Sequence, residues 1–360
     1  MTQAIVQAPQ RRGITSFLNP SYLPLLATLL VVVAMFVGGS VSFDNFFSVK
    51  TVLDLFNSNA FIGVAAIGAT IVILSGGIDL SVGSVVAFTT ILMAKLIHPA
   101  VEGGVSGAGM HPMVAAIIAL VIGAAFGACM GMLIHFFELP PFMVTLAGMF
   151  FVRAVGFLVH NVNLGINHPF LSDTLAGLAW HVTDVEGRRG RTFPIYLQFH
   201  AIIMILMFVL AIVMLHLSAF GRNVYAVGGD EQSAKLLGVP VGRTKILVYT
   251  LSGFFSTLAG VVLTIYKQAG NPADQIGLEL DAIAAVVIGG TLLTGGRGYV
   301  LGTLLGVLVL GLIQALIINA SVNSAWTRIV VGGLMLSFIV MQIGFGALTK
   351  RLTRSALAPA

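Results

Sequence analysis

Long apolar segments, separated by short polar connectors, make up most of this chain. A helix needs about 20 mainly apolar residues to cross a membrane, and ten segments come close to that length. Barrel strands would alternate apolar and polar residues, and these segments do not. The pattern predicts an all-α polytopic membrane protein with about ten transmembrane helices, at residues 22–39, 56–74, 82–98, 112–137, 142–160, 194–217, 245–266, 280–294, 299–318 and 325–341.

The composition supports this class. Of 360 residues, 58% are hydrophobic and 9% are charged, whereas a soluble domain carries about 25% charged residues. Basic residues near membrane spans usually set topology, so the net charge of +5 does not indicate a nucleic-acid partner. A single cysteine, Cys129, excludes an internal disulfide.

Two glycine-rich breaks interrupt the apolar pattern, one in each half of the chain. Residues 75–84 read SGGIDLSVGS and residues 295–303 read GGRGYVLGT. Both contain Gly-Gly, five further residues, and then Gly followed by Ser or Thr. Irregular backbone and a carboxylate persist at membrane depth only inside protein or along a water-filled path. Paired interruptions indicate a transporter built from an internal repeat, although glycine is also common in membrane helices.

These breaks supply most of the residues that we assign to a translocation path, namely Gly76, Gly77, Asp79, Ser81, Gly295 and Gly296. Phe150, Phe151 and Arg153 in the fifth apolar segment join them, because a buried charge needs a partner or a purpose. Arg153 either binds hydroxyl groups of a ligand, with the two rings stacking nearby, or forms an ion pair with Asp79 or Asp281. Asp281 opens the eighth segment, where its carboxylate either caps the helix or lines the path.

The polar segment 218–243 contains a short helix with clear start and stop signals. Asp230 is a good N-cap, Glu231 favours the positive helix start, and Lys235 favours the negative end. Gly238 suits the C-cap, and a proline two residues later stops the helix. Ala234 and Leu237 are predicted to share one face. The helix either docks in a groove of another protein or is a solvated linker.

Charge near the spans gives an orientation and a domain plan. Ten spans place both termini on one side, and the tails and the 218–243 segment favour the cytoplasm for that side. We therefore expect a cytoplasmic tail at 1–21, a transmembrane domain at 22–343 with a long periplasmic loop at 161–193, and a cytoplasmic tail at 344–360.

The chain lacks the sequence signatures of an enzyme. Its eight histidines show no metal-ligand spacing, no serine lies in a Gly-x-Ser-x-Gly elbow, and the dipeptide Gly-Lys of a phosphate-binding loop never occurs. The sequence thus predicts no metal or cofactor on this chain. If transport uses ATP, another subunit must hydrolyse it.

With these motifs in place, the chain resembles the monosaccharide permeases of ABC importers, which include ribose, xylose, arabinose and galactose permeases. Three stretches carry the resemblance: LSGGIDLSVGS at 74–84, GGDEQSAKLLGV at 228–239 and ELDAIAAVVIGGTLLTGGRG at 279–298. The match covers about residues 56–341. Within this family the chain is most similar to galactofuranose permeases, through AGMFF at 147–151 followed by Arg153, and INHP at 166–169.

The resemblance implies a set of partners in a bacterial inner membrane. The helix at 230–238 would be the coupling helix, seated in a groove of a cytoplasmic ATPase that uses ATP and Mg. A periplasmic sugar-binding protein would deliver the substrate, and a second, different permease would complete a heterodimer. The loop departs from the usual Glu-Ala-Ala core, because it reads Glu-Gln-Ser-Ala at 231–234. That departure leaves docking plausible and a particular ATPase contact open.

Two other transport functions stay open at this point. A branched-chain amino-acid permease of the same broad architecture would carry a zwitterion, which two opposed charges in the cavity would favour. A stand-alone ion-coupled transporter would work without an ATPase. A membrane enzyme has no catalytic set of residues to support it.

Overall fold

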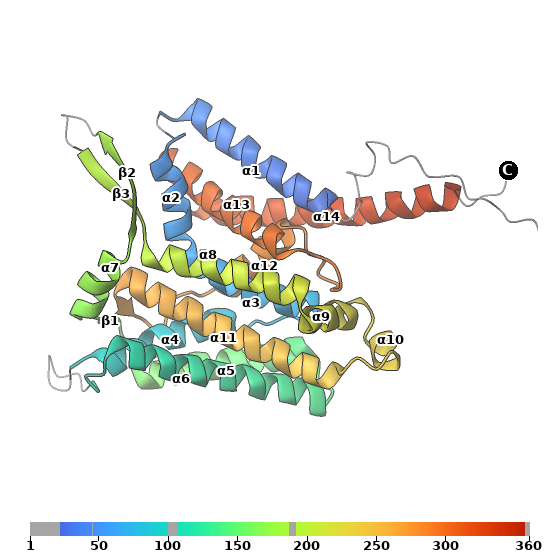
Figure 1. Cartoon of the computed structure of the whole chain (residues 1–360), viewed down its shortest axis with the longest axis horizontal. Helices are drawn as coiled ribbons and strands as arrows, with labels where there is room; N and C mark the ends of the chain where they lie inside the picture. Colours follow the sequence, from blue (N-terminus) through green and yellow to red (C-terminus); the bar gives the residue numbers. More distant parts are fainter. Residues whose placement is uncertain (1–21, 45, 100–106, 187–191, 357–360) are drawn as a thin grey trace, which may run out of the picture.

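The computed structural model describes residues 22–44, 46–99, 107–186 and 192–356. The predicted tail at 1–21 lies outside these residues. A helix occupies each of the ten predicted segments (Figure 1): α1 Leu23–Ser42, α3 Ala60–Leu74, α4 Val82–Ile97, α5 Pro112–Phe136, α6 Pro141–Val159, α8 Phe199–Ile212 continued by η3 Val213–Leu217, α11 Val241–Lys267, α12 Leu278–Ile288, α13 Val300–Asn319 and α14 Ala325–Ala356. The all-α polytopic class is confirmed.

Three of the helices beside the two breaks, α3, α4 and α12, are shorter than a full span, whereas α13 is long enough to be one. Within the described ranges, seven helices are long and apolar enough to cross a membrane, or eight if α2 (Val49–Ser58) and α3, which meet at a 56° bend, form one span. At 1.5 Å per residue, the 11 residues of α12 cover only about half of a hydrocarbon core of roughly 30 Å. Segment 280–294 therefore contains a shorter helix than predicted, because the glycine-rich backbone after Ile288 ends it, whereas α4 spans almost all of segment 82–98.

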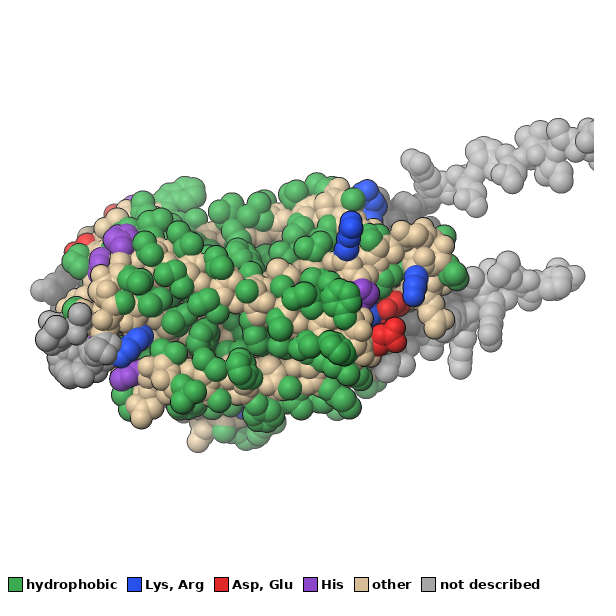
Figure 2. All heavy atoms as spheres, turned by 90° about the horizontal axis from the view of Figure 1, so that it is seen from below, with side chains coloured by type: hydrophobic (Ala, Val, Ile, Leu, Met, Phe, Trp, Pro, Cys, Tyr) green, Lys and Arg blue, Asp and Glu red, His purple; other side chains and the backbone are tan. Residues whose placement is uncertain are grey.

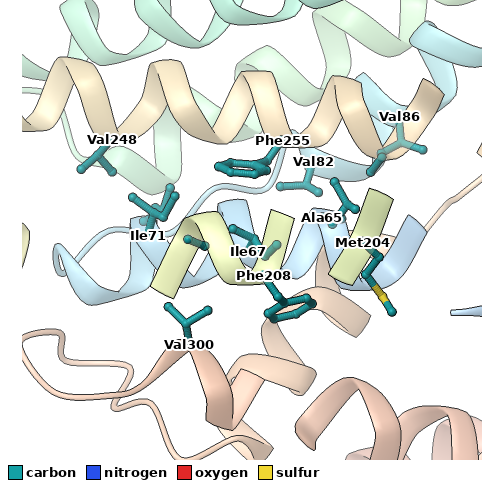
Figure 3. Close-up of a cluster of buried hydrophobic side chains, with 14 of the residues drawn as sticks. Ala65, Ile67, Ile71, Val82, Val86, Met204, Phe208, Val248, Phe255 and Val300 are labelled. Carbon is teal, nitrogen blue, oxygen red and sulfur yellow. The ribbon is translucent and has the colours of Figure 1, made fainter. Parts of the chain in front are cut away.

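Helix α11 lies at the centre of the bundle and packs against α5 on one side and α3 and α4 on the other. Three glycines spaced four apart on α5 face it, at positions 123, 127 and 131. A Cβ on Gly127 would lie on the carbonyl oxygen of Tyr249, so the two backbones touch. The small-residue stripe thus allows close approach of the helices. Figure 3 shows the adjoining core, to which α3, α4, α8, α11 and α13 contribute aliphatic and aromatic side chains.

The predicted long loop 161–193 contains regular structure. Strand β1 (Leu164–Gly165) pairs antiparallel with β4 (Ala269–Gly270), and β2 (Trp180–Glu186) pairs with β3 (Thr192–Leu197). A π-helical turn η2 (Phe170–Thr174) and a short helix α7 (Leu175–Gly177) lie between them. The sixth span begins at Phe199 and not at residue 194, because the β-branched and aromatic residues of β3 form a strand before it.

Two opposite ends of the bundle carry different elements (Figure 1). Helices α9 (Ala219–Gly229) and α10 (Glu231–Leu236) lie at one end, together with the start of α1 and the far end of α14. The β2–β3 hairpin and α7 lie at the other end. Figure 2 shows a largely apolar side face, with charged side chains gathered towards its two ends. This distribution fits a protein whose flank is in lipid.

Candidate translocation and coupling sites

The first glycine-rich break starts where a left-handed glycine ends α3. Gly76 has φ +83°, and its N–H donates to the carbonyl of Ile73 at 2.9 Å. The N–H of Gly77 donates to the carbonyl of Val72 at 3.0 Å. This pair of bonds is the Schellman motif, which satisfies the last carbonyl groups of a helix.

The second break starts in the same way at the end of α12, but not at the glycines that the sequence match suggested. Gly290 has φ +90°; its N–H donates to Val287 at 2.9 Å, and that of Thr291 donates to Val286 at 3.2 Å. Gly76 therefore corresponds to Gly290 and not to Gly295. Both breaks thus begin with the same kind of helix end, at a register shifted from the Gly-Gly match, and the internal repeat stays a prediction.

The two breaks meet each other at the end of the bundle that carries α9 and α10. The N–H of Gly296 donates to the carbonyl of Leu74 at 2.9 Å. Gly228, near the end of α9, is packed between them: a Cβ there would lie on the Leu74 carbonyl oxygen and 2.8 Å from the nitrogen of Gly296. The structure thus brings the predicted Gly76, Gly295 and Gly296 together with Gly228, a glycine of the polar segment 218–243.

Asp79 is buried and is held by hydroxyl and backbone donors. Its Oδ1 accepts from the N–H of Ser81 at 2.8 Å and from the Ser81 hydroxyl at 2.6 Å. Its Oδ2 accepts from the hydroxyl of Ser252 on α11, also at 2.6 Å. The carboxylate therefore orders the start of α4 and fixes the first break to α11. Gly77 and Ser81 are buried as well, and assignment of these residues to the path stays a prediction.

Arg153 lies on α6 and holds the turns that connect α11 to α12. Its Nη1 donates to the carbonyl of Asp274 at 2.7 Å and to that of Pro272 at 3.2 Å. In the described part of the chain it forms no ion pair with Asp79 or Asp281, so that alternative is wrong. Sequence reasoning missed these partners because any residue can offer a carbonyl.

The other predicted residues near Arg153 do not converge on it. Phe150 and Phe151 are each 65% exposed on the outer face of α6. Phe151 lines an apolar groove of 330 Å³ between α5 and α6, with Met130 and Met143. Asp281 lies half-buried in the first turn of α12, as the helix-start interpretation requires, but its side chain makes no capping bond there.

Glu279, in the same turn as Asp281, is a candidate site residue that the sequence analysis did not single out. Its Oε2 atom is buried and has no hydrogen-bond partner among the described residues. A Cβ on Gly83, in the first turn of α4, would lie on that oxygen, so glycine leaves room for the carboxylate. The sequence did offer one signal for Glu279, because it is a second carboxylate, two residues before Asp281, in the same first helical turn.

We predict that Arg153→Met lowers both stability and uptake, because two charge-assisted bonds that fix the 271–277 segment are lost. Bonds to charged groups contribute roughly 1.5–3 kcal/mol, so uptake is expected to fall at least about fivefold, with a lower Tm. Arg153→Lys should retain part of both. The measurements are thermal unfolding of the purified chain and uptake by the assembled transporter; wild-type values for Arg153→Met would contradict the assignment.

Helix α10 has the caps that the sequence predicts. Asp230 Oδ1 accepts from the N–H of Ser233 at 2.6 Å, and this hydrogen bond lowers the pKa of the carboxyl group. At the other end Gly238 has φ +79°, and its N–H donates to the carbonyl of Lys235 at 3.1 Å. Glu231 forms an ion pair with Lys245 of α11, with 2.6 Å between Oε1 and Nζ. Both ends of α10 are therefore fixed.

The side chains of α10 differ in exposure more than predicted. Ala234 is buried against Val227 and Val241. Leu236 and Leu237 are 89% and 84% exposed. The predicted shared face for Ala234 and Leu237 is therefore wrong, because Leu237 is already the C-cap and turns away from the bundle. The result is a short helix that is anchored through Ala234 and exposes two leucines at its C-terminal end.

We predict that Asp230→Ala weakens binding of the partner to α10 severalfold, whereas Asp230→Asn retains it because asparagine also caps helices. The lowered pKa adds a pH dependence. The stabilisation is complete above the ordinary aspartate pKa and is lost as the pH falls through the lowered one. Recovery of the partner with tagged permease at neutral and acidic pH measures both effects. Equal recovery with Asp230→Ala and Asp230→Asn at neutral pH would contradict the capping role.

Comparisons with known proteins agree on one family. Residues 51–339 match the family described as branched-chain amino acid transport system / permease component. The chain is 45% identical over 91% of its length to the inner membrane ABC transporter permease protein YjfF of Escherichia coli, covering 93% of that protein. No solved structure matches.

Two relatives whose names state a substrate match over almost the same share of the two chains. The fructose import permease protein FruG of Bifidobacterium longum is 35% identical over 90% of this chain and 92% of its own. The ribose import permease protein RbsC of Bacillus subtilis is 35% identical over 89% of this chain and 91% of its own. The chain belongs to the family of ABC transporter permeases, and it is a multi-pass inner-membrane transport subunit that is not itself an enzyme.

Proposed function

We propose that this chain is the permease subunit of an ATP-driven monosaccharide importer, and that its substrate is galactofuranose. The observation that carries the sugar class is the match over about nine-tenths of the chain to permeases named for ribose and fructose import. The assignment of galactofuranose as the substrate rests on the residues at 147–153 and 166–169, which resemble those of galactofuranose permeases. The branched-chain amino-acid alternative is not favoured, because these named relatives carry sugars.

We further propose that the end of the bundle with α10 faces the cytoplasm and binds the ATPase. The exposed Leu236 and Leu237 offer an apolar docking surface, and the caps of α10 hold it in a fixed shape. In this arrangement ATP and Mg act in the partner subunit. The opposite end, with the β2–β3 hairpin, is then periplasmic and faces the sugar-binding protein.

The cycle that we propose needs no covalent step in this chain. ATP binding in the partner moves α10, and the permease pair alternates between outward and inward openings. The second permease is a related but different chain. The path residues proposed for this subunit are Gly76, Gly77, Asp79, Ser81, Phe150, Phe151, Arg153, Asp281, Gly295 and Gly296, to which Glu279 is now added. The sugar should bind weakly in the path, because tight binding would slow its release.

Uptake by the complete complex in proteoliposomes tests this function. Labelled D-galactose, whose solution contains the furanose form, would be compared with D-ribose, D-fructose and L-leucine, each with and without ATP. ATP-dependent uptake of galactose in preference to the other sugars is the expected result. Preference for ribose or fructose would overturn the finer assignment, and leucine uptake would overturn the sugar class. Accumulation by this chain alone, without nucleotide, would overturn the whole proposal.

A further inference from the structure

Helix α10 is flanked in sequence by two helices, and each of them is hydrogen-bonded to a different break. On the N-terminal side, the hydroxyl of Tyr225 on α9 donates to the carbonyl of Gly298 at 2.8 Å. Tyr225 is half-buried, and burial raises the pKa of its phenol, which keeps it a donor. The second break is thereby attached to α9.

On the C-terminal side, α11 holds the first break. The Ser252 hydroxyl donates to Asp79 Oδ2 at 2.6 Å, and both groups are buried. This bond joins segments 173 residues apart in the sequence. A neighbouring hydroxyl on the same helix, that of Ser256, is buried without a hydrogen-bond partner among the described residues. The attachment of α11 to the first break through a serine hydroxyl is therefore specific to Ser252.

The two breaks are also bonded to each other, which closes a ring. The bond from the Gly296 N–H to the Leu74 carbonyl connects them directly, and Gly228 fills the space between their backbones. The ring runs from α10 through α9, Tyr225, the second break, the first break, Asp79 and Ser252 into α11, and so back to α10. Because glycine has no side chain, few side-chain hydrogen bonds among the described residues hold the irregular backbone of the breaks to other helices, namely those of Tyr225 and Ser252 and the bond from Thr145 of α6 to the Ile78 carbonyl.

We propose that Tyr225 and Ser252 are positioning residues that make both breaks move with α10 during the transport cycle. The proposal rests on the proposed coupling role of α10. A displacement of α10 by its partner pulls on both flanking helices, and each flanking helix carries one break with it. Irregular backbone absorbs such displacements more readily than a continuous helix, which makes the breaks suitable hinges. Without the two hydroxyl bonds, α10 would move and the breaks would follow only partly.

The ratio of sugar imported to ATP hydrolysed tests this coupling in the complete complex. The double variant Tyr225→Phe with Ser252→Ala would be measured with labelled D-galactose in proteoliposomes. We expect uptake to fall at least about fivefold, from the loss of two hydrogen bonds of ordinary strength, with ATP hydrolysis changed less than about twofold. A parallel fall in both rates, or an unchanged ratio, would overturn the proposal.

Two matched variants remove the same chemical groups outside the ring. Ser256→Ala deletes a buried hydroxyl one turn along α11, and Tyr266→Phe deletes a phenol hydroxyl near the other end of that helix. Both should retain the wild-type ratio of uptake to hydrolysis. A ratio lowered as much as in the double variant would mean that hydroxyl removal in general, and not the ring, causes the effect.

Amide hydrogen exchange of the purified chain tests the ring without any transport measurement. Tyr225→Phe is expected to speed exchange in residues 289–299 and also in 75–81, because the Gly296–Leu74 bond transmits the loosening. Unchanged exchange in both segments would overturn the ring. If the wild-type complex fails to import galactose, the substrate assignment fails, and the exchange result still decides whether Tyr225 positions the breaks.

Discussion

Transport is expected to be lost, by more than about tenfold, when Gly228 is replaced by alanine. The added Cβ would lie on the carbonyl oxygen of Leu74, and it would also crowd the nitrogen of Gly296. Overpacking costs about 1–3 kcal/mol where side chains can adjust. Here the neighbours are backbone atoms of both breaks, so the strain must displace the junction itself. Uptake by the complex and thermal unfolding of the chain measure the two consequences.

The adjacent glycine provides the control for this substitution. A Cβ on Gly229 would meet no atom within 4 Å, so Gly229→Ala should retain uptake and Tm. The two variants add the same methyl group at neighbouring positions of α9. Wild-type uptake and Tm in Gly228→Ala, or an equal loss in Gly229→Ala, would contradict the close junction.

Replacing both Leu236 and Leu237 by aspartate should abolish binding of the ATPase. These leucines are the most exposed apolar side chains on α10, so their removal costs the fold little. Buried apolar anchors at interfaces contribute about 2 kcal/mol or more each, and loss of two corresponds to a fall of roughly a thousandfold in affinity. Recovery of the ATPase with tagged permease, together with uptake, measures the effect.

A double substitution of the same leucines by methionine is the matched control. Methionine retains an apolar side chain of similar volume, so binding and uptake should persist. The Tm of the aspartate variant should equal that of the wild type, which separates lost docking from lost folding. ATPase recovery at the wild-type level with the aspartate variant would show that α10 is not the docking surface.

Local signals explain which parts of this structure could be read from sequence. The ten apolar segments each become a helix because burial and lipid both require apolar side chains there. The caps of α10 were predictable because Asp230 and Gly238 act on backbone groups within a few residues. Glycines 123, 127 and 131 lie four residues apart, a spacing that allows another helix to approach closely, but only the structure shows that this helix is α11.

Contacts between distant segments could not be read in the same way. The match between the breaks was misaligned, since Gly290, Gly295 and Gly296 are all left-handed and only the helix end shows which of them corresponds to Gly76. Arg153 bonds to carbonyl groups, which every residue possesses. Ser252 belongs to a stripe of small residues at every fourth position, which indicates helix packing and not a bond to Asp79. Tyr225 carried no such signal, and the partners of both lie in segments that only the folded chain brings near.

The unequal length of the two breaks has a consequence for how both breaks can be moved together. Residues 289–299 form a longer linker than residues 75–81, and it is the longer one that reaches both α9 and the end of α3. In the arrangement that we propose, the two breaks therefore need no separate inputs. A displacement of α9 would act on the second break and, through the Gly296–Leu74 bond, on the first, so that a single ATPase contact per subunit would move both.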